Sequence, residues 1–246
     1  MKAVRFRRAQ GGLLVRVLCA LFKQLILKLK VRGWGSELRS LASGEPLIFV
    51  SNHIGSYGPL SLLSALPLKL YPWVASEVTE LKAAACRLQK EFTELELRLR
   101  PPLSAWLARA IGRICVFIMH DIQAIPVYAS SRRIRSTLDR SLELLLKGKS
   151  VLVFPENKER PLNEVLGDFS TGFLAMARLY YQKTRKAIAF LPVAVNNRVK
   201  GIKLGKPIRF DGRRPFLQEK LRLKGELERS IYALDYSVEE ELAPAR

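Results

Sequence analysis

The sequence predicts an α/β fold in which helices cover a mostly parallel β-sheet. Two continuous apolar runs, at 150–154 and 187–195, have the length and composition of strands that are buried on both faces. Segments with helical spacing alternate with such strands, which is the order expected of parallel strands joined by crossover helices. The chain has 246 residues, of which 48% are hydrophobic, and this is enough for one substantial core.

Each predicted element depends on a local pattern. A helix over 77–99 ends before Pro101 and Pro102, because proline cannot continue a helix, and Gly148 stops the helix at 134–147. The predicted strands are 46–51, 71–76, 124–128, 150–154, 187–195 and short strands near 201–210. The predicted helices are 59–66, 77–99, 103–114, 134–147, 171–182 and 216–234, together with one near the N-terminus.

The N-terminal segment is basic and amphipathic. Every charged side chain from Met1 to Ser36 is a lysine or an arginine, and leucines recur at helical spacing over 13–30. Arg16 and Lys23 interrupt this apolar run too early for a transmembrane helix, which needs roughly 20 apolar residues. We therefore expect residues 1–35 to be a membrane-contact segment that lies in the headgroup region, and residues 36–246 to form the α/β domain. The alternative is a helix that packs on the core with its lysines in water.

The charge balance predicts an anionic partner. The chain has 42 Lys and Arg against 22 Asp and Glu, which gives a net charge of +20. Such a charge suits nucleic acid, an anionic lipid surface or phosphorylated substrates. The sequence has no recognisable nucleic-acid module, so we expect no nucleic-acid partner. An anionic membrane surface fits the basic N-terminal segment, and we expect a peripheral protein on the cytoplasmic face of the membrane.

His53 is the candidate catalytic base. It directly follows the predicted strand 46–51, and reacting groups in α/β proteins commonly lie where strands end. No carboxylate follows it within the next turn or two to orient the imidazole ring. Asp121, Glu77 and Asp168 are possible partners from elsewhere in the chain. The alternative is a structural histidine whose ring is satisfied by its surroundings.

Four short motifs occur in an order that is similar to one enzyme family. They are Asn52-His53, Ile125-Pro126-Val127, Phe154-Pro155-Glu156 and Leu191-Pro192-Val193. Over roughly residues 31–210 the chain resembles the glycerolipid acyltransferases of the lysophosphatidate (1-acylglycerol-3-phosphate) acyltransferase type. The resemblance implies transfer of a fatty acyl group from a thioester donor, acyl-CoA or acyl-carrier protein, to the hydroxyl of a glycerophosphate or lysophospholipid.

The resemblance also implies a role for five residues. His53 would act as general base, and Asn52, Glu156, Lys158 and Arg160 would bind the substrate, with the two cations facing the phosphate of the acceptor. From the residues alone, Glu156 could equally be a surface carboxylate, and Lys158 and Arg160 a solvated charge cluster. The sequence shows no nucleotide fingerprint, metal-ligand spacing or Cys–His pair, so we expect no cofactor beyond the acyl donor as co-substrate.

The chain departs from the family at three motifs. Gly58 stands where the family has an aspartate after its Asn-His pair, Tyr128-Ala129 replaces Asp-Arg, and 157–160 replaces Gly-Thr-Arg-Ser. In serine proteases, weakening the carboxylate that orients the catalytic histidine lowers the rate by about 10⁴-fold. A second hypothesis is therefore a catalytically impaired paralogue that binds lipid or acyl-CoA without turnover.

Overall fold

The computed structural model describes residues 29–55, 57–95, 97–128, 133–161 and 166–242. The helix predicted near 13–30, and with it most of the membrane-contact segment predicted over 1–35, lies outside these residues. From Lys30 to Arg32 the chain forms strand β1, which pairs in parallel with β9 (Gly201–Leu204). The last residues before the predicted boundary at 35 therefore contribute a strand to the main sheet.

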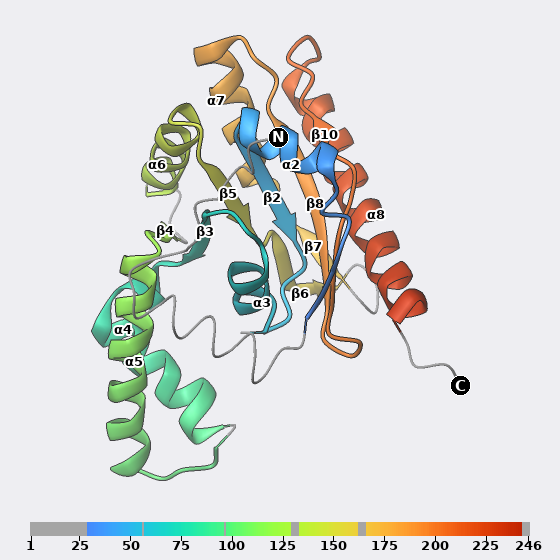
Figure 1. Cartoon of the computed structure of the whole chain (residues 1–246). Helices are drawn as coiled ribbons and strands as arrows, with labels where there is room; N and C mark the ends of the chain where they lie inside the picture. The colour runs from blue at the N-terminus through green and yellow to red at the C-terminus, as the bar shows by residue number, and fades with distance from the viewer. Residues whose placement is uncertain (1–28, 56, 96, 129–132, 162–165, 243–246) are drawn as a thin grey trace, which may run out of the picture.

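The strands of the described residues form a mostly parallel sheet, as the sequence predicts (Figure 1). Besides β1 and β9 it contains β2 (Leu47–Ser51), β3 (Leu70–Ala75), β4 (Ile125–Val127), β5 (Ser150–Val153), β8 (Ala189–Asn196) and β10 (Ile208–Arg209). The order is β1-β9-β8-β2-β5-β3-β4, with β10 paired to β8. β2, β3, β4, β5 and β8 run in one direction, and β9 and β10 run against β8. The carboxyl ends of the five parallel strands therefore lie at one edge.

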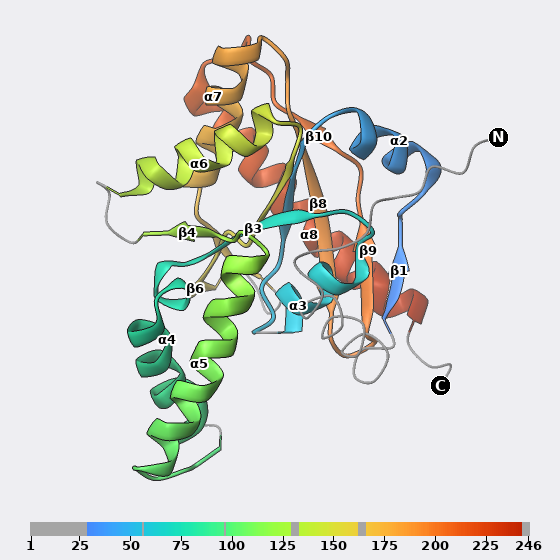
Figure 2. The same cartoon turned by 60° about the vertical axis from the view of Figure 1, so that its left-hand side comes forward.

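Helices cover both faces of this sheet (Figures 1 and 2). One face is covered by α2 (Ser36–Gly44) and α3 (Tyr57–Ala65), and the other by α6 (Ile134–Leu146), α7 (Ala175–Thr184), which follows the short η4 (Gly172–Leu174), and α8 (Phe216–Leu242). Along β2, Leu47 and Phe49 pack toward α2 and α3, whereas Ile48 and Val50 pack toward α6, α7 and α8. All four are fully buried. This alternation is what a strand between two helical layers requires.

Between β3 and β4 the chain extends away from the sheet as a helical arm, by which we mean the described residues of 76–121 (Figure 2). The arm consists of η2 (Ser76–Thr79), α4 (Leu81–Leu88), the π-helical η3 (Gln89–Glu94) and α5 (Leu103–Asp121). α4 and α5 lie side by side, and a Cβ placed on Gly112 would lie 3.3 Å from the backbone nitrogen of Ala85. Glycine at 112 therefore allows the two helices to approach closely.

The prediction of one continuous helix over 77–99 was wrong. No glycine or proline interrupts this stretch, yet Glu80 between η2 and α4 is extended and the helical turns end at Glu94. The Thr93 hydroxyl donates to the carbonyl of Gln89 (3.0 Å) and to the carbonyl of Ser104 (3.2 Å), which joins η3 to the start of α5. The arm therefore turns back at its tip instead of extending as a single rod.

A second difference is a small antiparallel hairpin outside the main sheet. β6 (Glu156–Pro161) pairs with β7 (Gly167–Phe169), and neither was predicted. The residues of β6 are mostly charged and show no alternation of polar and apolar side chains, so the local pattern gives no strand signal. This hairpin begins at Glu156, one of the predicted site residues.

Candidate active site

His53 lies directly beyond the carboxyl end of β2, at the edge of the sheet where the five parallel strands end. Its side chain is half-buried. The ring contacts Phe154, which follows β5, edge-to-face, with 5.2 Å between the ring centroids and an angle of 84° between the planes. Since β2 and β5 are neighbours in the sheet, their ends place the histidine against an aromatic side chain that restricts its ring.

Asn52 fixes the backbone just before the histidine. Its side-chain NH₂ donates to the carbonyl of Val195 (2.9 Å), and its Oδ1 accepts from the N–H of Val195 (2.8 Å). The residue is only 2% exposed. The amide therefore continues the pairing between β2 and β8 beyond the last strand residue. The substrate-binding role that the resemblance implies for Asn52 stays a prediction, and the geometry assigns this side chain a positioning role.

Glu156 binds the same loop from the other side. One carboxylate oxygen accepts a hydrogen bond from the backbone N–H of His53 (2.6 Å), and the other accepts one from the N–H of Gly167 (3.0 Å). The carboxylate thus ties the end of β2 to the β6–β7 hairpin. Bonds from backbone N–H groups to an ionised carboxylate are among the stronger hydrogen bonds in proteins. This contact brings together the first and third sequence motifs, which lie about a hundred residues apart.

Gly58 lies in the first turn of α3, where its N–H donates to the carbonyl of Ile54 (3.1 Å). The residue is buried, yet a Cβ at this position would meet its nearest atom, the carbonyl oxygen of Asn52, at 3.5 Å. That is ordinary van der Waals contact. The position therefore has space for the first atom of a side chain, although the natural residue has none.

The three carboxylates proposed as partners of His53 have other surroundings. Asp168, on β7, accepts a hydrogen bond from Lys224 of α8 (2.6 Å), and Lys224 also pairs with Glu228 (2.9 Å). Burial by itself lowers the pKa of Lys224, but the hydrogen bonds to Asp168 and Glu228 outweigh it, and the pKa lies above its ordinary value. Glu77 is exposed in η2 and Asp121 ends α5, so both belong to the helical arm. The carboxylate found at His53 is that of Glu156.

The side chains of Lys158 and Arg160 lie outside the described part of the chain, although their backbone forms the middle of β6. That strand begins at Glu156, whose carboxylate touches the backbone of His53. The predicted phosphate-binding role of the two cations stays a prediction.

Within the described ranges, no group of three or more His, Cys, Asp or Glu side chains is arranged to hold a metal ion. Cys86 and Cys115 are free thiols of the helical arm rather than of the strand ends, and burial raises the pKa of Cys115. The third cysteine, Cys19, lies outside the described residues.

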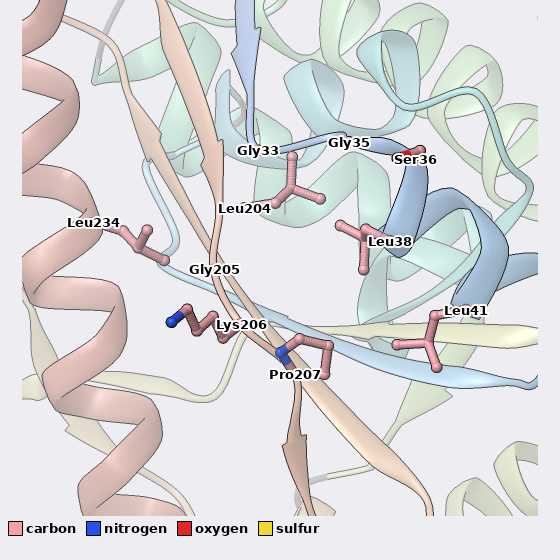
Figure 3. A pocket seen from close by; sticks show the side chains of 10 residues that line it. All are labelled: Gly33, Gly35, Ser36, Leu38, Leu41, Leu204, Gly205, Lys206, Pro207 and Leu234. Carbon is pink, nitrogen blue, oxygen red and sulfur yellow. The ribbon is translucent and has the colours of Figure 1, made fainter.

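Figure 3 shows a cavity, which has a volume of about 720 Å³. It is lined by α2, by the turn after β9 and by α8, with Leu38, Leu204 and Leu234 among its side chains and Lys206 as its cation. α2 precedes β2 in the chain, so it lies at the amino end of that strand, whereas His53 lies at the carboxyl end. The cavity is thus separate from the candidate site.

Replacing Glu156 with glutamine is expected to weaken the histidine loop. A glutamine side chain has one acceptor oxygen, so one of the two backbone N–H groups would face an NH₂ group instead. Leaving such a donor without its acceptor costs about 1–3 kcal/mol, and we expect a loss of this size in the free energy of unfolding, measured in urea. The exposed Glu77→Gln is the matched control and should stay within about 0.5 kcal/mol of the natural chain. Equal stabilities of the two variants would contradict the bridging role.

Comparison with known proteins gives a similarity in structure but none in sequence. No family model matches the chain, and no curated protein matches it in sequence. The fold matches the crystal structure of the 1-acyl-sn-glycerophosphate (LPA) acyltransferase PlsC from Thermotoga maritima, with a TM-score of 0.50 and 17% sequence identity. The match covers 94% of this chain and 81% of that one. The resemblance seen in the four short motifs is thus confirmed at the level of the fold: the chain folds like a lysophosphatidate acyltransferase.

Proposed function

We propose that the protein is a glycerolipid O-acyltransferase. It transfers a fatty acyl group from acyl-CoA or acyl-carrier protein to the hydroxyl of a glycerophosphate or lysophospholipid. The observation that carries the proposal is the placement of His53 at the carboxyl end of β2, with its backbone held by Glu156, in a fold like that of an LPA acyltransferase. An imidazole is the side chain that accepts and releases a proton near neutral pH, as this reaction requires.

The reaction proceeds as an attack of the acceptor on the thioester. His53 takes the proton of the acceptor hydroxyl while the oxygen bonds to the thioester carbonyl carbon. The tetrahedral species then collapses, the C–S bond breaks, and the imidazolium gives its proton to the departing thiolate. The products are an ester and a free thiol, and the histidine returns to its starting state.

The remaining roles follow the same proposal. Lys158 and Arg160 bind the phosphate of the acceptor, because cationic side chains form charge-assisted hydrogen bonds to phosphate. The basic segment 1–35 brings the protein to an anionic membrane, on the cytoplasmic face, where lysophospholipid acceptors are found. The high net charge of +20 supports this location.

A second candidate function is a lipid-binding or acyl-CoA-binding protein without turnover. Gly58 favours it, because the position that carries an aspartate in the acyltransferase family has no side chain here. The frame around the histidine does not depend on that aspartate, since Asn52 and Glu156 hold it. Fold and loop geometry are therefore compatible with either function.

Product formation decides between the two. Purified protein is incubated with anionic vesicles, with acyl-CoA or acyl-carrier protein, and with a panel of glycerol phosphates and lysophospholipids. Acylated product is measured by mass spectrometry. We expect an ester product with at least one acceptor that carries a phosphate. Binding of acyl-CoA or lipid, with no product above the protein-free control for any acceptor, would instead establish the second function.

A further inference from the structure

One face of α5 is apolar and open to solvent. Leu103 is 55% exposed, Trp106 68%, Ile114 55% and Phe117 50%. With 3.6 residues per turn, these four residues and Ala110 lie on one side of the helix. α5 is also long and apolar enough to cross a membrane by length and composition, and it has little burial within the protein. A soluble helix seldom leaves this many large apolar side chains together in water.

The tip of the helical arm continues this apolar face. Leu95 is 74% exposed and Leu97 is 45% exposed, and both lie in the turn that leads to Leu103. The apolar surface of the arm, which we define as Leu95, Leu97, Leu103, Trp106, Ala110, Ile114 and Phe117, therefore extends from the turn along much of α5. It lies on a part of the molecule that stands away from the sheet in both views (Figures 1 and 2).

Along α5 and the residues just before it the charged side chains are all basic, whereas Glu94 and Glu96 flank Leu95 at the tip in the sequence. From Leu97 to His120 the charged side chains are Arg98, Arg100, Arg109 and Arg113, with no carboxylate, and all four arginines are exposed. Arg109 and Arg113 lie one turn apart along one flank of the apolar face, and the other two lie at the tip. Leucine and tryptophan beside arginine form the combination that suits a bilayer interface: the apolar side chains enter the acyl region and the guanidinium groups bind phosphate.

Hydrogen bonds and helix packing within the helical arm hold its elements together. At its tip, the Ser104 hydroxyl donates to Glu94 (3.2 Å), and the side-chain NH₂ of Gln89 donates to the same carboxylate oxygen (2.8 Å). Midway along, Gly112 packs on the backbone of Ala85. These contacts hold α5 on α4, so the apolar surface is presented as a fixed face.

The arm also extends from the edge of the sheet that carries the candidate site. It starts after Ala75, the carboxyl end of β3, and β3 runs parallel to β5, which in turn runs parallel to β2. His53 follows the carboxyl end of β2 at that same edge. Figure 1 shows the arm extending beyond this edge. A partner surface that binds the helical arm would therefore lie on the same side of the molecule as His53.

We propose that the helical arm docks on a lipid bilayer that carries anionic headgroups, with the apolar surface of the arm seated in the interface. The arm lies on the bilayer and does not cross it, because Arg109 and Arg113 interrupt the middle of α5 and its partner α4 has only eight residues. This contact is separate from the basic segment 1–35. It is also independent of catalysis, and a protein without turnover would show it as well.

The test measures partition of the full chain onto vesicles without any acyl donor. Vesicles of phosphatidylcholine with a quarter of phosphatidylglycerol are sedimented with the natural chain, with Trp106→Glu/Phe117→Glu, and with Leu217→Glu/Leu221→Glu. The control pair lies on α8 and is 66% and 61% exposed, so both variants add two carboxylates to exposed apolar positions. We expect the partition coefficient of the arm variant to fall by at least about 10-fold and that of the control to stay within about two-fold. Equal losses in the two variants would overturn the proposal.

A second measurement locates Trp106 directly and uses no charged variant. Phosphatidylcholine with brominated acyl chains quenches tryptophan fluorescence at short range. Trp106 is exposed, whereas Trp34 and Trp73 are half-buried. We expect quenching of the natural chain and loss of most of it in Trp106→Phe. Equal quenching of both proteins would overturn the proposal, and so would a natural chain that sediments as a dimer without lipid while the arm variant is a monomer.

Discussion

Replacement of His53 by glutamine is expected to lower the rate of acyl transfer by about 10²–10⁴-fold, the usual contribution of a positioned general base. Glutamine retains a polar side chain of similar length but cannot take a proton from the acceptor hydroxyl. The substitution should leave the fold intact, since the hydrogen bond from residue 53 to Glu156 comes from the backbone N–H. The measurement is the initial rate of ester formation at saturating donor and acceptor.

The second histidine supplies the matched control for this experiment. His120 is exposed near the end of α5, where a ring nitrogen lies 3.2 Å from the carbonyl of Thr79. His120→Gln should retain the rate of the natural chain within about two-fold, as is usual for an exposed position away from the chemistry. A His53→Gln protein that is folded and transfers acyl groups as fast as the control would remove His53 from the mechanism.

The second large effect is expected at Gly58. Gly58→Asp introduces the carboxylate that the acyltransferase family carries at this position, and the structure has space for its Cβ. A carboxylate in the first turn of α3 is favoured by the helix dipole and would help to hold the histidine in its working tautomer. We expect a rise of about 10²-fold or more in the rate of ester formation. In serine proteases, weakening the carboxylate that orients the histidine lowers the rate by about 10⁴-fold.

Gly58→Asn separates the charge from the side-chain volume. Asparagine has nearly the same size and, like aspartate, removes conformational freedom of glycine from the unfolded chain, but it carries no charge. The rate should rise with aspartate and stay near that of the natural chain with asparagine. If both variants behave alike, the carboxylate has no partner at His53, and the base is oriented by other groups.

The sequence predicted the parts of the fold whose side chains repeat a simple pattern. β2, β5 and β8 are apolar on both sides because helices cover both faces of the sheet, and this makes them continuous runs in the sequence. The helical turns of 77–99 end at Glu94, next to the hydrogen bond from Thr93 to Ser104, a contact between segments that only the folded chain brings together. The residues of β6 do not alternate between polar and apolar side chains, so the sequence pattern gave no indication of a strand there.

The candidate site was predicted residue by residue but not as a geometry. The sequence singled out Asn52, His53 and Glu156, and it could not show that the two flanking residues bind backbone groups across the sheet. The hypothesis that Asp121, Glu77 or Asp168 orients the ring of His53 stays a prediction, and the carboxylate that binds the backbone N–H of His53 is that of Glu156. Distances between motifs a hundred residues apart depend on the order of the strands in the sheet. The pattern of polar and apolar residues within each segment does not reveal that order.

The hydrogen bonds of Asn52 and Glu156 have a consequence for how this site can change. Both side chains form hydrogen bonds to backbone groups of Val195, His53 and Gly167. These backbone groups are present whatever side chains stand at the three positions. Position 167 requires glycine, because a Cβ there would lie 2.5 Å from the carbonyl oxygen of Asn157. Positions 53 and 58 are under no such constraint. The hydrogen bonds that hold this loop therefore do not depend on the side chains at 53 and 58. Substitutions at these two positions can change the chemistry of the site while the backbone around them keeps its shape.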